Sequence, residues 1–161
     1  LGRPLISRVV SVTGEGVNQP ANLQVRIGDS VASLLRQCGG LKEDVERLVS
    51  GGPMMGIALL QEDVPVTKGM SGILALRKAQ LGPREQTACI RCGRCLSGCP
   101  IHLMPFELCN DCERNDWAAA EKHGALDCIE CGSCTYVCPA KREITSSIRI
   151  AKRQIMAARK K

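Results

Sequence analysis

The first part of the chain carries patterns of apolar residues that predict strands. Residues 7–13 are rich in β-branched side chains and end at Gly14, which is typical of a strand followed by a turn. Leu23, Val25 and Ile27 alternate with polar neighbours, as expected for a second strand with one buried face.

A short helix is predicted directly after these strands. Ser30 is a suitable N-cap, apolar residues recur at helical spacing over residues 31–38, and Gly39 provides a stop. Cys38 falls on the apolar face of this helix. The favoured interpretation of its thiol is a small packed hydrophobe and not a ligand.

More strand is expected from residues 45–50, from Val64 and Val66, and from the run 73–76. Strands around one helix predict a small α+β domain over residues 1–77, with the β-grasp arrangement as the natural choice. Its glycine-rich turn matches neither a dinucleotide fingerprint nor a P-loop. No catalytic residue is predicted in this domain.

The remainder of the chain has helical patterns. Residues 78–87 form a predicted linker, and residues 88–161 a second domain. Within it, residues 105–114 and 116–123 predict two short helices, and the apolar positions of residues 144–155 predict an amphipathic terminal helix.

Two cysteine runs organise this second domain. Both have the spacing C-x2-C-x2-C-x3-C-P, which is used by ferredoxins with two 4Fe–4S clusters. In such proteins the fourth cysteine of each run binds the other cluster. The predicted ligands are therefore Cys89, Cys92, Cys95 and Cys138 for the first centre, and Cys128, Cys131, Cys134 and Cys99 for the second. The fold class is α+β, with an α-helical two-cluster ferredoxin-like domain after the β-grasp domain.

Other uses of these cysteines are less consistent with the spacing. Structural zinc takes four ligands in separated C-x2-C pairs, and a disulfide framework suits a short secreted chain with a signal peptide. An iron–sulfur enzyme that acts on a substrate needs an iron without a protein ligand, whereas eight motif cysteines supply a thiolate for every iron. We therefore expect an electron carrier and assign no catalytic residue.

Four further residues are candidate ligands by type only. Cys109 and Cys112 share one helical face, but two thiols cannot hold a cubane, so ordinary buried cysteines are favoured over zinc or a cluster shared with another chain. His102 and His123 have no ligand-like neighbours in the sequence. They are expected at the surface or in contact with the cluster ligands, without binding iron themselves.

The net charge gives little support to nucleic-acid binding. The chain has 161 residues and a formal net charge of +6, which two oxidised clusters of about −2 each would reduce to about +2. Aromatic residues are few and are not interleaved with basic ones. The basic residues at the C-terminal end, including Lys152 and Arg159, favour a solvated helix face, with contact to anionic lipid or an acidic partner as the alternative.

Cysteine usage and hydropathy indicate where in the cell the protein is expected. Thiols that are kept reduced for cluster assembly favour the cytoplasm or the cytoplasmic face of a membrane. No apolar run approaches the ~20 residues that a spanning helix requires. The chain begins with Leu1 and enters a strand-like pattern, so we expect a piece of a longer polypeptide.

The chain resembles the C subunit of the Rnf (also called Rsx) electron-transport complexes. The stretches that carry the resemblance are residues 3–10, Arg26-Ile27-Gly28, Ser50-Gly51-Gly52-Pro53-Met54-Met55-Gly56, residues 89–95 and residues 126–132. The cysteine runs occur in many ferredoxins, but their combination with the Gly-Gly-Pro-Met-Met-Gly turn is more specific. The resemblance covers essentially the whole chain.

This resemblance implies a soluble-ligand-binding (SLBB) β-grasp domain followed by a dicluster domain. It implies a peripheral subunit at the cytoplasmic face of the bacterial inner membrane, in an ion-translocating NADH/ferredoxin oxidoreductase. Expected partners are the other subunits, with ferredoxin or a flavin domain as redox partner. FMN and NADH would bind only upstream of this chain. Cys109 and Cys112 are not part of the family pattern that we associate with this subunit.

Two alternatives remain open from the sequence. The cobalamin reductase of bacterial microcompartments shares this architecture. The β-grasp half is also compatible with a binding module in which the clusters are only structural, and binding of cobalamin to that half would favour the microcompartment family.

The charges beside the two runs differ. Arg91 and Arg94 flank the first centre, whereas Glu130 and Ser133 take the corresponding places at the second. A nearby cation favours the reduced cluster, so the first centre is predicted to have the higher potential. The alternative is that both arginines face solvent or dock a partner.

The double substitution Arg91→Glu and Arg94→Ser is accordingly expected to lower the potential of the first centre. A redox titration followed by EPR measures this shift, and an unchanged titration would contradict the role given to these arginines.

Overall fold

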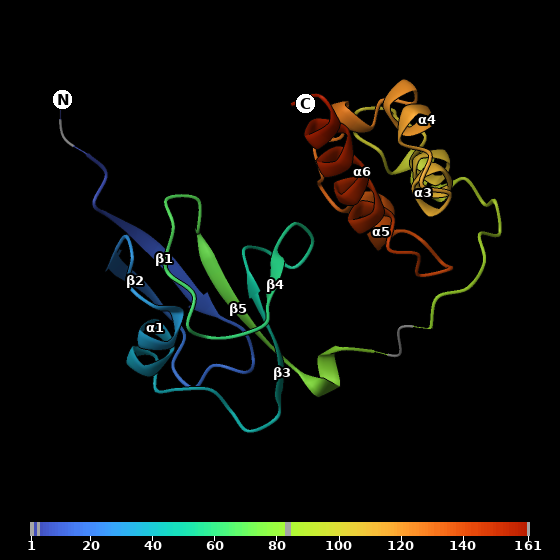
Figure 1. Cartoon of the computed structure of the whole chain (residues 1–161). Helices are drawn as coiled ribbons and strands as arrows, with labels where there is room; N and C mark the ends of the chain where they lie inside the picture. Colours follow the sequence, from blue (N-terminus) through green and yellow to red (C-terminus); the bar gives the residue numbers. More distant parts are fainter. Residues whose placement is uncertain (1, 3, 83–84, 161) are drawn as a thin grey trace. The chain divides into compact units, whose positions relative to one another are not determined.

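The computed structural model describes residues 2, 4–82 and 85–160. The chain divides into two compact units, Leu1–Pro83 and Arg84–Lys161 (Figure 1). A 3-10 helix, η1 (Lys78–Gln80), occupies part of the predicted linker.

The first unit is built on a five-stranded mixed sheet with the order β2-β1-β5-β3-β4. Its strands are β1 (Ser7–Thr13), β2 (Ala21–Arg26), β3 (Val45–Ser50), β4 (Ile57–Leu59) and β5 (Gly72–Arg77). β1 and β5 are parallel neighbours, and the other paired strands of the described sheet are antiparallel. A central parallel pair made by the first and last strands fits the predicted β-grasp arrangement.

One helix, α1 (Val31–Gln37), covers the core of this sheet. It begins as predicted, because the Ser33 N–H donates to the Ser30 hydroxyl at 3.2 Å. Leu34 of this helix and Ile73 of β5 are both fully buried in one core. Cys38 caps the helix and is 1% exposed in the same core, which confirms that it packs as a small hydrophobe.

The prediction of strand at Val64 and Val66 is wrong. These residues flank Pro65, which has no N–H to donate to a ladder. Their carbonyls instead accept single hydrogen bonds from residues around the start of α1. The Val31 N–H donates to the Val64 carbonyl and the Gly28 N–H to the Val66 carbonyl, each at 2.9 Å. Strand β4 was not predicted, because three residues are too few to show an alternation.

The second unit is helical in its described part. It contains α2 (Arg94–Ser97), α3 (Pro105–Glu113), α4 (Trp117–Lys122), η2 (Ala125–Asp127), α5 (Ser133–Tyr136) and α6 (Ile144–Ala158). α6 packs against α3 and α4 (Figure 1). Its inner face consists of Ile144, Ile148, Ala151 and Ile155, each at most 3% exposed, so the predicted amphipathic terminal helix is confirmed. None of the helices in the described ranges is long and apolar enough to cross a membrane.

Gly14 offers a test of the close approach between β1 and β5. It has a φ of +111°, and a Cβ there would lie 2.2 Å from the Ala75 carbonyl oxygen. Gly28 has a similar φ of +100°, and a Cβ added there would meet nothing within 4 Å, so it is a matched control for backbone strain alone. We expect Gly28→Ala to cost roughly 1–3 kcal/mol of unfolding free energy.

Gly14→Ala is expected to cost more, because the two strands must also separate. Hydrogen exchange of the β1 and β5 amides in the full chain measures both losses, and equal losses would contradict the crowding at Gly14.

Candidate metal centres

The two cysteine runs lie in halves of the helical unit that repeat the same local structure. α5 follows α2, and α6 follows α3, at the same sequence offset that separates Cys128 from Cys89. Each half therefore consists of a cysteine run around a one-turn helix, followed by a longer helix. The halves are related in sequence position throughout, so corresponding residues can be compared directly.

Left-handed backbone shapes both runs in the same way. Arg91 and Glu130, two residues after the first cysteine of each run, have φ values of 55° and 57°. Gly93 and Gly132 follow with φ values of 74° and 82°. Such residues curl the chain, so that successive cysteines turn towards one side. Left-handed backbone at a non-glycine residue costs on the order of 1–3 kcal/mol and is common at functional sites.

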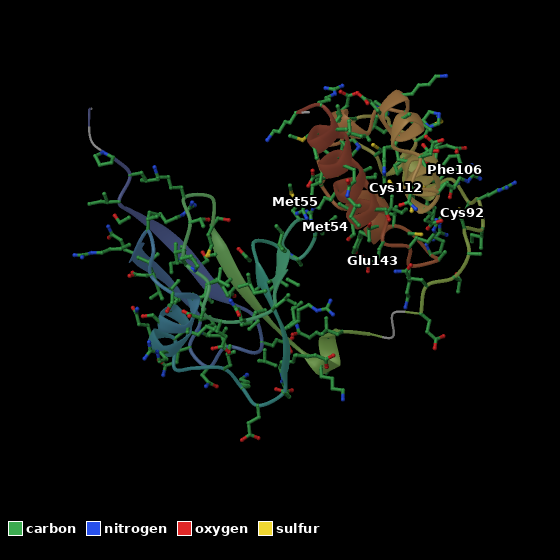
Figure 2. All side chains as sticks on the ribbon, viewed as in Figure 1. Met54, Met55, Cys92, Phe106, Cys112 and Glu143 are labelled. Carbon is green, nitrogen blue, oxygen red and sulfur yellow. The ribbon has the colours of Figure 1, made fainter. Side chains whose placement is uncertain are left out.

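The first cavity of this unit has a volume of about 270 Å³. The cysteines in its wall are Cys89, Cys92, Cys95 and Cys138. These are the residues that the spacing predicts for the first centre. Leu96 and Phe106 contribute apolar wall, and Figure 2 labels Phe106 together with the exposed Cys92.

The second cavity is smaller, with a volume of about 20 Å³. The cysteines in its wall are Cys99, Cys128, Cys131 and Cys134. Each cavity is thus lined by three cysteines of one run and the last cysteine of the other run.

The donor set of both cavities fits a 4Fe–4S cluster in kind, because such a cluster takes four thiolates. In volume the cavities differ. An eight-atom core needs several times the ~30 Å³ of one water molecule, so the first cavity has room and the walls of the second must move apart. Within residues 2, 4–82 and 85–160, no three His, Cys, Asp or Glu side chains form a group that could hold a single metal ion. The ligand assignment stays a prediction.

Neutral hydrogen-bonding groups reach every sulfur that lines the second cavity. The pairs are the Leu103 N–H with Cys99 at 3.3 Å, the Glu130 N–H with Cys128 at 3.4 Å, the Ser133 hydroxyl with Cys131 at 3.5 Å, and the Thr145 hydroxyl with Cys134 at 3.5 Å. Such groups stabilise negative charge on sulfur, which is the form that binds iron.

The thiols differ in acidity. Burial raises the pKa of Cys95 and of Cys128, whereas hydrogen bonds from Ser133 lower the pKa of Cys131. A coordinated metal deprotonates a thiol outright, so metal binding at the buried cysteines releases protons.

A buried arginine lines the first cavity. The Arg142 side chain is 8% exposed, donates to the Glu113 carboxylate, and donates to the Asn110 side-chain oxygen at 3.2 Å. Burial alone would lower the pKa of Arg142, but the hydrogen bond to Glu113, together with the nearby Cys109, the Glu113 charge and Cys89, outweighs it and raises that pKa. The guanidinium therefore stays charged.

An ion-pair cluster lies at the second cavity. Glu130, which lines this cavity, accepts from Arg149 at 2.8 Å and from Lys152 at 2.9 Å. Burial raises the pKa of Glu130, but these two cations outweigh it and the pKa is lowered. Lys152 also donates to the Cys128 carbonyl at 2.8 Å, so the expectation that it is simply solvated is wrong.

Arg91 and Arg94 are both exposed, and of the two only Arg91 lines the first cavity. Solvent and salt screen exposed charges, so their effect on a cluster is weaker than that of a buried charge. Arg142 was not found from the sequence. A comparison of the two halves could have found it, because the residue that corresponds to Arg142 in the first half is the uncharged Leu103.

Cys109 and Cys112 line neither cavity and are 1% and 9% exposed in the core beside α6 (Figure 2 labels Cys112). Burial raises the pKa of Cys112 to about 11, with the neighbouring Cys109 adding to the rise. Both are buried, and their role as ordinary packed cysteines stays the favoured interpretation.

His123 has a partner that the sequence did not reveal. Its Nδ1 lies 2.7 Å from the carboxylate of Asp111, which is 5% exposed on α3. This pair joins the end of α4 to α3 and leaves His123 apart from both cavities. His102 is exposed, as expected.

Comparison with known proteins finds one domain family and several curated relatives. The SLBB domain family matches residues 9–58. The chain is 46% identical, over 99% of its length, to the C subunit of the Na⁺-translocating ferredoxin:NAD⁺ oxidoreductase complex of Acetobacterium woodii. It is a homologue of the C subunit of the ion-translocating Rnf complexes. The resemblance inferred from the sequence is confirmed.

Two further relatives support this homology. The C subunit of the ion-translocating oxidoreductase complex of Rhodobacter capsulatus is 46% identical over 94% of the chain, and that of the proton-translocating ferredoxin:NAD⁺ oxidoreductase complex of Clostridium ljungdahlii is 45% identical over 98%. The chain spans 36%, 29% and 35% of the lengths of the Acetobacterium, Rhodobacter and Clostridium proteins. It corresponds to about a third of this Rnf subunit.

Replacing His123 tests the buried pair in this unit. His123→Ala leaves the Asp111 carboxylate buried without its imidazole partner, which is expected to cost roughly 1–3 kcal/mol of unfolding free energy. The midpoint of thermal unfolding measures the loss. The control is His102→Asn, because His102 is exposed and Asn tolerates its φ of 57°. Equal midpoints for the two variants would contradict a stabilising role of the pair.

Proposed function

We propose that this chain is the electron-transfer segment of an Rnf-type C subunit and relays single electrons through two 4Fe–4S clusters. The observation that carries the proposal is the lining of two cavities, each by three cysteines of one run and the fourth cysteine of the other. Such clusters, when bound, accept and donate one electron at a time.

In this proposal the cysteines of each cavity hold one cluster through their thiolates. Residues 88–161 are then a dicluster ferredoxin-like domain, and residues 1–77 an SLBB-type docking domain. The apolar wall of the first cavity, which includes Leu96 and Phe106, limits the access of water to the cluster. The hydrogen bonds to sulfur at the second cavity, such as that from Thr145, hold the cysteine side chains in place.

The names of the relatives extend the proposal to the parent complex. Two of them are subunits of ferredoxin:NAD⁺ oxidoreductases, one Na⁺-translocating and one proton-translocating. We infer that this chain works with the other subunits of such a complex at the cytoplasmic face of the membrane, with ferredoxin or a flavin domain as redox partner. FMN and NADH are assigned to the region upstream. The coupling ion differs between the relatives, so none is assigned.

The microcompartment reductase alternative gains no support from these relatives, which are all named as ion-translocating complex subunits. An electron-relay role also accounts for both cysteine runs, whereas a binding module uses only the first domain.

Paired cysteine substitutions test the proposed ligation. Cys89 and Cys138 line the same cavity, so Cys89→Ser with Cys138→Ser is expected to disable one cluster and leave about four of eight irons. Cys89 and Cys99 line different cavities, so Cys89→Ser with Cys99→Ser is expected to disable both clusters. Iron and acid-labile sulfide are measured anaerobically, together with EPR of the reduced protein.

The control is Cys38→Ser, a buried cysteine of the other unit, which is expected to keep about eight irons. If the two double variants exchange their outcomes, each run binds its own cluster and the crossed ligation is wrong. Wild-type protein with four irons, or with zinc, would contradict the two-cluster proposal itself.

A further inference from the structure

The walls of the two cavities differ at corresponding positions. Arg142 lines the first cavity, and at the same offset Leu103 lines the second. At a second pair of corresponding positions the polarity is reversed, because the apolar Phe106 lines the first cavity and the polar Thr145 lines the second. The first site therefore has a buried cation and an apolar wall, where the second has an aliphatic residue and a hydroxyl.

The positive charge of Arg142 at the first cavity is only partly offset by its partners. Its partner Asn110 is neutral, and the side chain of its anionic partner Glu113 is 58% exposed, so solvent screens the carboxylate more than the buried guanidinium. Arg142 and Cys89 lie in the wall of the same cavity.

The charges at the second cavity are arranged differently. Glu130 is part of its wall, whereas the cations that pair with Glu130, Arg149 and Lys152, are not among the lining residues. Lys152 also donates to the Cys128 carbonyl at 2.8 Å, so a cation and a carboxylate both act at this site, and the charge in the wall itself is the carboxylate. The groups that hydrogen-bond to the sulfurs of this site are neutral N–H and hydroxyl groups.

We infer that Arg142 sets the reduction potential of the first centre above that of the second. The inference rests on the proposed two-cluster function. Reduction adds one negative charge to a cluster, and a buried cation in the wall of its cavity stabilises the reduced form. With both clusters bound, the electron would favour the first centre, where Cys92, one of the predicted ligands, is exposed.

Substitution of Arg142 in the full chain tests the inference. Arg142→Gln removes the charge and retains polar length, Arg142→Lys retains the charge, and Arg91→Gln removes an exposed charge at the same cavity. Iron and sulfide are counted first, and an anaerobic redox titration followed by EPR is then carried out.

The wild type is expected to titrate in two separate one-electron steps. Arg142→Gln is expected to lower the midpoint potential of the step at higher potential. The expected change is at least tenfold in the ratio of reduced to oxidised cluster at a fixed potential, which corresponds to about 59 mV. Arg142→Lys and Arg91→Gln are expected to shift that step by less than half as much.

Fully loaded Arg142→Gln protein with unchanged steps would overturn the inference and leave the two-cluster function standing. Loss of iron from both Arg142 variants would assign this residue a structural role and overturn the inference as well. Fewer than about eight irons in the wild type would instead refute the proposed function.

Discussion

The central constraint in the helical unit is that four sulfurs must line each of two cavities. A run with two-residue gaps supplies three of them, because the left-handed residues Arg91 and Glu130 curl the backbone. The fourth comes from the other run, and the packing of α6 against α3 holds the two runs together. The core between these helices, centred on Leu108 and Ile148, therefore supports the geometry of both cavities at once.

The repeated halves also explain where the two sites can differ. Cysteines, left-handed residues and helix starts keep a constant offset, since each is required to form a cavity. Side chains that only line the walls are free to change, and Arg142 against Leu103 is such a change in charge at a buried position. Geometry is thus common to the two sites, whereas the electrostatic environment is specific to each.

The sequence predicted those features that depend on local spacing. Strand β1, the cap of α1 and the apolar face of α6 follow from neighbouring residues. The cysteines that line each cavity are those that the motif spacing groups, and their ligation stays a prediction. The strand at Val64 and Val66 failed because Pro65 removes a donor between them. Arg142 and the pair of Asp111 with His123 depend on which helices face each other, which local patterns do not encode.

The crossed arrangement of the runs has a consequence for biosynthesis. Under the proposed ligation, the first run leaves the ribosome with three thiols whose fourth partner, Cys138, is still to be made. At about 5–20 residues per second, the wait lasts on the order of seconds. The centre whose cysteines are translated first is therefore completed only when the second run emerges. A nascent or prematurely terminated chain would present an incomplete iron site, which gives the assembly machinery a reason to act after translation of α6.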